Sequence, residues 1–111
     1  ASGGQAGTGQ ELLPGMILSN EPGYYKAGAY GIRIENLVLV ESREIAGADG
    51  AYMGFEVLTF CPIDRALVDC SLLTRDDVAW WNAYHAQVLA VIGPQLDGAA
   101  LDWLKEQCAP L

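Results

Sequence analysis

The sequence predicts an α+β fold, with an antiparallel sheet followed by two C-terminal helices. In the first half of the chain, short runs rich in Ile, Val and Phe alternate with turns that contain Gly and Pro, which is the pattern of strands. Beyond Pro62 the apolar residues recur instead at the spacing of one helix face. Strands that precede helices along the chain are typical of the α+β class.

Three strands are expected in order. The first covers residues 16–18, after a turn at Pro14-Gly15, and is closed by a turn at Pro22-Gly23. A polar connection at residues 26–29 leads to the clearest strand, residues 31–42, whose apolar character on both sides predicts a buried, central place in the sheet. After a loop at residues 47–50, the third strand, residues 55–61, is expected to pair antiparallel with the second.

Two helices follow. Thr74 is expected to cap the first, with Asp77 completing a capping box, and Gly93-Pro94 to end it. Its inner face is predicted from helical spacing and consists of Val78, Trp81, His85, Val88, Leu89 and Ile92. Asp97 is expected to cap the second helix, whose predicted inner face is Leu101, Leu104 and Cys108.

Composition narrows the class of partner. The 111 residues carry a net charge of −8 with a pI near 4.3, which argues against nucleic acid and against an anionic membrane surface. No apolar run approaches the roughly 20 residues that span a bilayer, and the start of the chain does not have the pattern of a signal peptide. We expect a cytoplasmic protein whose acidic balance serves solubility.

Two features of the chain suggest a reducing compartment and a longer parent. The three cysteines, an odd number at wide spacing, predict buried free thiols and no disulfide framework. Residues 1–11 are Gly-rich and are predicted to form a flexible linker. Because the chain also lacks an initiator Met, we expect a piece of a longer protein.

Two glutamates stand in distinctive settings. Glu21 ends the first strand, and Glu35 lies within an apolar run, residues 32–40, that predicts a buried strand. A buried acid is costly unless a cation or a donor meets it. Alternation along the strand puts Arg33 on the same face as Glu35. The residues leave two interpretations open: part of a hard-metal site, or an Arg33–Glu35 ion pair beside an edge strand, because two carboxylates are too few for a dedicated metal site.

The glutamate motifs resemble a known family. Residues 20–25 (NEPGYY) followed by residues 30–36 (YGIRIEN) are similar to the catalytic domain of Xaa-Pro aminopeptidases, or aminopeptidases P, in the pita-bread metallopeptidase family. Residues 12–16 (LLPGM) also fit, and the rest of the chain, including residues 81–85 (WNAYH), resembles the C-terminal extension of the larger members. The similarity covers residues 12–111.

The resemblance implies the C-terminal half of a pita-bread fold. It divides the chain into the linker at 1–11, a segment of the catalytic domain at 12–64 and a helical extension at 65–111. It implies that Glu21 and Glu35 are metal ligands, the second shared by two divalent ions, commonly manganese. It places Arg33 and Tyr25 in a hydrogen-bond network next to the metals.

The implied activity is hydrolysis of the bond between an N-terminal residue and a following proline. Two metal ions activate the attacking water and stabilise the developing oxyanion. The family's upstream aspartates and histidines have no match in this sequence, so we expect the chain alone to bind metal weakly or not at all and to be inactive. The implied partners are peptides with proline at the second position and, through the extension, a second subunit.

Other residues have simpler interpretations. His85 is expected to be a packed helix residue, since no second histidine accompanies it. The aromatic residues of the helices are expected to lie in the core, with a subunit interface as the alternative: Trp80, Trp81, Tyr84 and Trp103. Besides an aminopeptidase fragment, we consider a non-catalytic binding module of the same fold, a dimerisation segment, and a stand-alone α+β domain whose carboxylates are simply paired.

Overall fold

The computed structural model describes residues 11–47, 50 and 52–111, so the predicted linker lies outside the described residues except for Glu11. Antiparallel sheets precede two helices, which confirms the predicted α+β class. The chain divides into two units, the first ending at Thr59 and the second running Phe60–Leu111. Each unit is described by itself.

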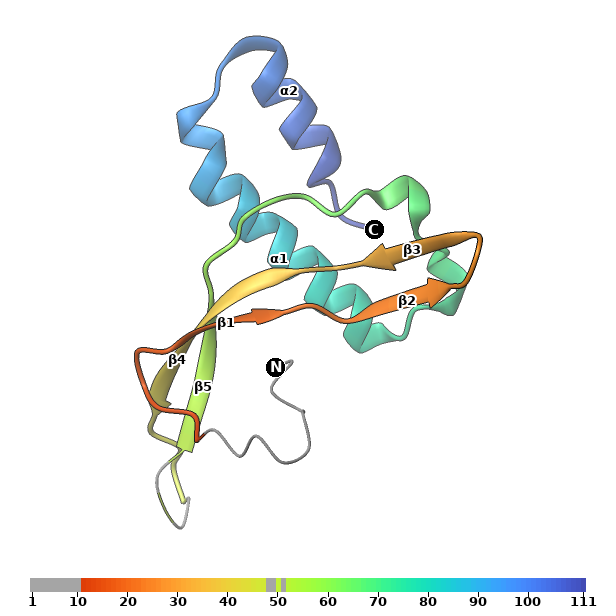
Figure 1. Ribbon diagram of the computed structural model, residues 1–111. Coiled ribbons are helices and arrows are strands. Elements are labelled where there is room, and N and C mark those ends of the chain that lie inside the picture. The colour runs from red at the N-terminus through yellow and green to blue at the C-terminus, as the bar shows by residue number, and fades with distance from the viewer. Residues whose placement is uncertain (1–10, 48–49, 51) are drawn as a thin grey trace. The chain divides into compact units, whose positions relative to one another are not determined.

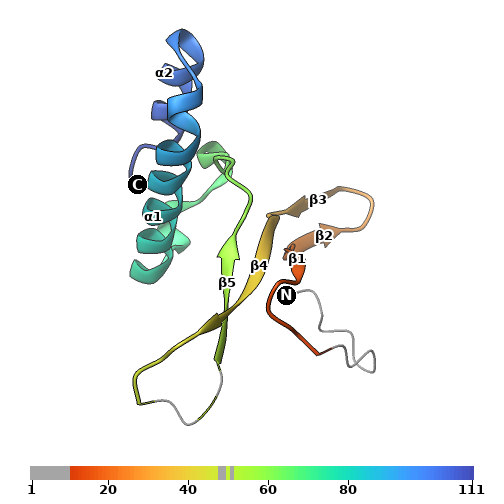
Figure 2. The same cartoon turned by 90° about the vertical axis from the view of Figure 1, so that its left-hand side faces the viewer.

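The first unit contains a three-stranded antiparallel sheet of β1 (Ile17–Asn20), β4 (Asn36–Arg43) and β5 (Tyr52–Val57). The order is β1-β4-β5, and Figure 2 shows β4 between its two neighbours. The central position of β4 and its pairing with the following strand are therefore as predicted. Val38 and Val40 on β4 are buried, with exposed fractions of 5% and 1%, and form the apolar centre of this sheet.

A second, two-stranded sheet consists of β2 (Gly23–Lys26) and β3 (Tyr30–Arg33). Figure 1 shows these strands continuing the lines of β1 and β4 as one long arm, here called the β2–β3 arm. A tight turn closes the arm, with the Ala29 N–H donating to Lys26 O at 3.1 Å. Gly28 has a φ of 72°, in the left-handed region that glycine enters without steric cost.

Two strand predictions are wrong at this point. Pro22-Gly23 does not turn the chain, because a new strand begins at Gly23. The expected continuous strand at residues 31–42 is instead interrupted at Ile34 and Glu35, between β3 and β4. The cause is Pro22, whose carbonyl accepts the Ile34 N–H at 3.1 Å. Proline has no N–H to return to Ile34, so the ladder lacks one of its two bonds there.

The predicted burial of residues 32–40 holds only within β4. Every residue of β2 and β3 is exposed, and so is Glu35. The arm is two strands wide, and none of the described elements of its unit covers either of its faces. An apolar sequence is therefore exposed along the arm in this chain.

The second unit is built around α1 (Arg75–Ile92). Its predicted capping box is confirmed: Thr74 Oγ1 accepts the Asp77 N–H at 3.1 Å, and Asp77 Oδ2 accepts the Thr74 N–H at 2.9 Å. These bonds satisfy two of the free N–H groups at the start of the helix. The helix ends at Ile92, immediately before Gly93-Pro94 as predicted.

The second helix, α2 (Gly98–Gln107), runs antiparallel to α1 (Figure 1). Leu104 and Cys108 are buried as predicted, while Leu101 is half-buried. Asp97 occupies the N-cap position, but its side chain makes no capping hydrogen bond. The expected cap is therefore wrong in its chemistry, although the helix begins where the sequence predicts.

Two side chains of α1 fasten the segment that follows the sheet. The Tyr84 hydroxyl donates to Cys61 O at 2.7 Å and accepts the Cys61 N–H at 3.3 Å. His85, fully buried, has Nδ1 2.8 Å from Trp81 O and accepts the Ile63 N–H on Nε2 at 3.1 Å. A backbone N–H can only donate, so Nδ1 carries the ring proton. His85 is thus the packed helix residue that the sequence predicts.

The end of the chain is tied to the same unit. Arg65 donates from Nη1 to Ala109 O at 2.9 Å and to Glu106 O at 3.4 Å, at the carbonyl end of α2. A cation is favourable there because the last carbonyls of a helix carry partial negative charge. The Leu111 N–H donates to Asn82 Oδ1 at 2.9 Å. Within the part of the chain that the structure describes, no helix has both the length and the apolar character needed to cross a lipid bilayer.

The cysteines are free, but the prediction that all are buried is wrong for Cys61 and Cys70, which are exposed. Both lie in the connection between β5 and α1, where most side chains face solvent. Cys108 is buried, and burial raises the pKa of its thiol.

We expect the native chain to react with a thiol reagent such as dithionitrobenzoate in two phases. Cys61 and Cys70 should react quickly and Cys108 slowly, because only the thiolate attacks and the raised pKa of Cys108 lowers its thiolate fraction at neutral pH. Denaturant should make all three fast, and Cys108→Ser should remove the slow phase. Fast reaction of all three thiols in the native chain would contradict this assignment.

The His85→Leu substitution should lower the free energy of unfolding by about 1–3 kcal/mol, because the half-buried Ile63 N–H loses its acceptor. Urea unfolding followed by circular dichroism measures the change. Gln87→Ala, on an exposed position of the same helix, is the control and should change little. Equal stability of the two variants would show that the His85 bond does not hold the segment.

Candidate metal centre

The two glutamates face each other across the arm. The register is the same on both sides of the interruption: Asn20 pairs with Asn36, and Gly23 with Arg33. Glu21 therefore falls opposite Glu35, at the point where the ladder is broken. Like charges at directly opposite positions of an antiparallel pair destabilise it.

The hydrogen-bond pattern brings these two side chains close. The Ile34 N–H donates to Pro22 O, so the pair that they form is of the hydrogen-bonded kind. Hydrogen-bonded and non-hydrogen-bonded pairs alternate along an antiparallel ladder, which makes Glu21 and Glu35 a non-hydrogen-bonded pair. In such pairs the Cα atoms are about 4.5 Å apart and the side chains are at their closest.

Alternation also sorts the arm into two faces. Side chains at every second position of a strand lie on the same face as Glu21, and so do the residues paired with them on the other strand. This polar face consists of Glu21, Gly23 and Tyr25 on one strand and Gly31, Arg33 and Glu35 on the other. The opposite face is mainly aromatic and aliphatic and consists of Pro22, Tyr24, Lys26, Tyr30, Ile32 and Ile34.

Arg33 is the cation of the polar face. Its Nε lies 3.1 Å from Oε2 of Glu35, with both side chains about half exposed. The charge of Glu35, a hydrogen bond to Tyr25 and the charge of Glu21 together raise the pKa of the Arg33 guanidinium. The other three residues singled out from the sequence, Glu21, Tyr25 and Glu35, therefore all lie within electrostatic reach of Arg33.

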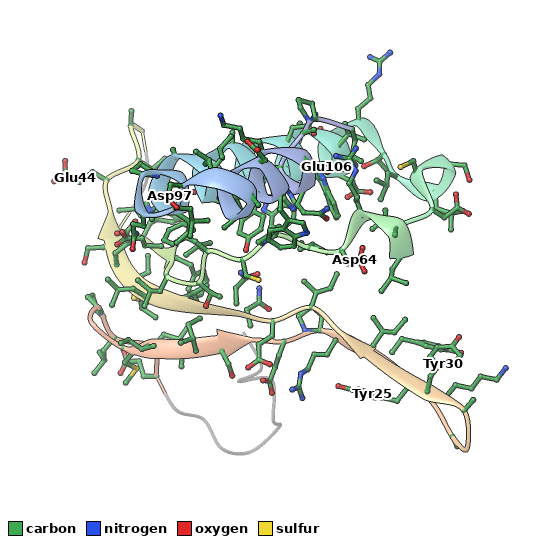
Figure 3. The ribbon with its side chains drawn as sticks, turned by 90° about the horizontal axis from the view of Figure 1, so that it is seen from above. Tyr25, Tyr30, Glu44, Asp64, Asp97 and Glu106 are labelled. Carbon is green, nitrogen blue, oxygen red and sulfur yellow. The ribbon has the colours of Figure 1, made fainter. Side chains whose placement is uncertain are left out.

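Tyr25 approaches Arg33 along the surface of the arm. Figure 3 shows its ring lying along the strands with the hydroxyl directed away from the closing turn. Because Arg33 has only donors, the Tyr25 oxygen is the acceptor of their hydrogen bond. A chain of contacts thus runs from Tyr25 through Arg33 to Glu35.

The donor set suits a hard divalent cation, because carboxylate oxygens are the preferred ligands of Mg²⁺, Ca²⁺ and Mn²⁺. Two facing carboxylates beside one guanidinium also leave an excess of negative charge at the interruption. Among the described residues, however, no group of three or more His, Cys, Asp or Glu side chains is placed to hold a metal ion. The residues present fit one part of a metal centre.

The ion pair that the sequence offered as the simpler interpretation is also present, since Arg33 and Glu35 are paired. His85 belongs to the other unit, and its two ring nitrogens already contact Trp81 O and the Ile63 N–H. Sequence reasoning missed the part played by Pro22. Its signal was a proline directly after Glu21, at a position that breaks a ladder.

Comparison with known families gives two matches. Residues 51–111 match the C-terminal region of peptidase_M24, and residues 2–42, which include both glutamates, match metallopeptidase family M24. Among curated relatives, a probable Xaa-Pro aminopeptidase P of Coprinopsis cinerea is 47% identical over 104 residues, or 90% of this chain and 17% of the relative. Aminopeptidase P2 of Arabidopsis thaliana is 48% identical over 103 residues, 90% of this chain and 14% of the relative.

A solved structure is also similar. The X-prolyl aminopeptidase of Caenorhabditis elegans, described as a cytosolic enzyme with a di-nuclear active site, superimposes with a TM-score of 0.81 at 38% identity. The match covers 94% of this chain and 18% of that one. The chain thus spans less than a fifth of the length of these relatives.

Proposed function

The chain belongs to metallopeptidase family M24, as the C-terminal region of a Xaa-Pro aminopeptidase P with its C-terminal extension, and we propose that it supplies Glu21 and Glu35 as ligands of a two-metal centre. The observation that carries this proposal is the pairing of the two carboxylates at the interruption of the arm. A stable fold has no need for two acids at facing positions, whereas a shared cation requires them.

The residues of the polar face have distinct roles in this proposal. Glu21 and Glu35 each present a carboxylate on the polar face of the arm, at the interruption. Glu35 would be shared between two ions. Arg33 orients Glu35 through the contact at 3.1 Å, and Tyr25 in turn holds Arg33. Residues that hydrogen-bond to metal ligands in this way fix the orientation of the ligands and commonly contribute to metal affinity.

The reaction proposed for the parent protein is removal of an N-terminal residue from a peptide with proline at the second position. Two divalent ions, for which we propose manganese, supply an activated water and a Lewis acid for the scissile carbonyl. The oxygen donors of Glu21 and Glu35 match the ligand preference of Mn²⁺. The name of the Coprinopsis relative and the di-nuclear site of the Caenorhabditis enzyme support this assignment.

Two carboxylates cannot close a two-metal centre alone, so we propose that this chain by itself binds the ions weakly and is inactive as a peptidase. We further propose that residues 12–64 belong to the catalytic domain, that residues 65–111 form the extension, and that the protein acts in the cytoplasm. The cytosolic description of the Caenorhabditis relative supports the last point.

A second role is favoured by exposed apolar side chains in the helical unit. Trp80 and Trp103 are 52% and 54% exposed, and Leu67 and Leu72 more than 75%. Aromatic side chains, tryptophan in particular, are enriched at protein–protein interfaces. We propose that the extension contributes to a homodimer.

The metal proposal predicts that this chain binds Mn²⁺ with a dissociation constant in the millimolar range or weaker, because it supplies only the two carboxylate ligands Glu21 and Glu35. Calorimetry, or NMR line broadening by Mn²⁺, measures it. Glu21→Gln and Glu35→Gln should each abolish the binding.

Glu41→Gln is the matched control, because Glu41 is also a strand carboxylate paired with an arginine, Arg43, at 2.7 Å. It should leave Mn²⁺ binding unchanged. Tight stoichiometric binding by the wild-type chain, or equal loss of binding in all three variants, would refute the assignment of Glu21 and Glu35.

The dimer proposal predicts that Trp80→Glu lowers the mass measured by light scattering from that of two chains toward that of one, because a charge would be buried at the interface. Gln87→Glu, an exposed position on the same helix, should leave the mass unchanged. A monomeric wild-type chain at high concentration would remove the extension's proposed role.

A further inference from the structure

Two glycines lie beneath the ring of Tyr25. What we infer from them rests on the proposed metal-binding function of the polar face. Gly31 is the cross-strand partner of Tyr25, and Gly23 precedes Tyr25 by two residues on the same strand. All three positions belong to the polar face. The ring therefore lies over a stretch of the arm from which side chains are missing.

The distances show how closely the ring approaches. A Cβ atom on Gly31 would lie 2.7 Å from Cδ1 of Tyr25, and a Cβ atom on Gly23 would lie 2.7 Å from the Tyr25 hydroxyl oxygen. Contacts below 3.0 Å are essentially never made by real Cβ atoms. Any other residue at either position would displace the tyrosine.

Backbone conformation does not explain these glycines. Gly15, Gly28, Gly47 and Gly98 have positive φ, but Gly23 and Gly31 do not. Glycine inside a strand weakens the strand and often marks a place where another group comes close. Here the close group is the Tyr25 ring.

The ring position decides how Arg33 meets Glu35. In this structure Arg33 contacts Oε2 of Glu35 through Nε, while its guanidinium also bonds to the Tyr25 hydroxyl. The hydroxyl thus holds the guanidinium beside the Glu35 carboxylate.

We infer that Gly23 and Gly31 are positioning residues for the metal centre: they form a seat for the Tyr25 ring, so that its hydroxyl holds Arg33 and Arg33 in turn orients the Glu35 carboxylate. Filling the seat removes the hydrogen bond between the hydroxyl and Arg33, which loosens the contact of Arg33 with Glu35 and leaves the carboxylate less well oriented for the cation.

A purely structural alternative exists. An aromatic ring packed over a glycine on the opposite strand also stabilises a sheet. That alternative affects stability only, whereas the seat affects Arg33 and metal affinity. Gly31→Ala separates the two, because the strand itself gains from the loss of a glycine.

The test compares Gly31→Ala and Gly23→Ala with Tyr25→Phe in the 111-residue chain. The first readout is the rate at which the Arg33 Nε–H exchanges with water, followed by NMR at mildly acidic pH. All three variants should exchange roughly threefold to tenfold faster than the wild type, because the contact of Nε with Glu35 is weakened by about the free energy of one hydrogen bond. The second readout is Mn²⁺ line broadening at Glu21 and Glu35, which should require a several-fold higher Mn²⁺ concentration.

Gly50→Ala is the control, since a Cβ added at Gly50 has no atoms within 4 Å. It should leave both readouts unchanged. Gly31→Ala should also have no further effect in a Tyr25→Ala background, because the ring that it displaces is gone.

The inference is overturned if Gly31→Ala and Gly23→Ala leave Arg33 exchange at the wild-type rate while Tyr25→Phe accelerates it. It is overturned equally if Gly31→Ala has the same effect with and without the tyrosine ring. If no form of the chain, including the wild type, shows Mn²⁺ broadening at the glutamates, the proposed metal ligands are wrong. In that case the exchange rates still decide whether the glycines seat the ring.

Discussion

The missing N–H of Pro22 is the constraint on which the arm depends. The Ile34 N–H still donates to Pro22 O, so the two segments of the arm stay in register. The second bond of the pair, from an N–H of residue 22 to Ile34 O, cannot form because proline has no N–H. The ladder is therefore opened without being shifted. Glu21 and Glu35 meet at this opening, where backbone pairing is weakest and facing side chains are closest. A continuous ladder would place the same acids within a regular strand pair.

The two units differ in how their polar and charged side chains are paired. In the helical unit, Tyr84 and His85 bond to backbone groups of the segment after the sheet, and Arg65 covers the carbonyl end of α2. The β2–β3 arm instead leaves two facing carboxylates with a single nearby guanidinium. Its other face exposes tyrosine and isoleucine side chains. The arm thus combines excess negative charge on one face with uncovered apolar surface on the other.

Much of this arrangement could be predicted from the sequence, because the signals are local. The capping box of Thr74 and Asp77 depends on residues three apart, and the shared face of Arg33 and Glu35 depends only on alternation. The burial of the apolar run at residues 32–40 was predicted too broadly, since hydrophobicity does not say which strands lack a cover. The failed Asp97 cap depends on a side-chain rotamer. The seat under Tyr25 depends on cross-strand register, which strand propensity alone does not fix.

The closing turn of the arm sets the cross-strand register of Glu21 and Glu35, although it lies at the other end of the strands. Three residues, 27–29, separate β2 from β3, and their number decides which residue of one strand meets Glu21 on the other. One added residue in this loop would slide every later pair and reverse the side of the sheet to which each side chain belongs. The length of this loop is therefore constrained by a site from which it is remote, in addition to the constraint that the positive φ places on Gly28.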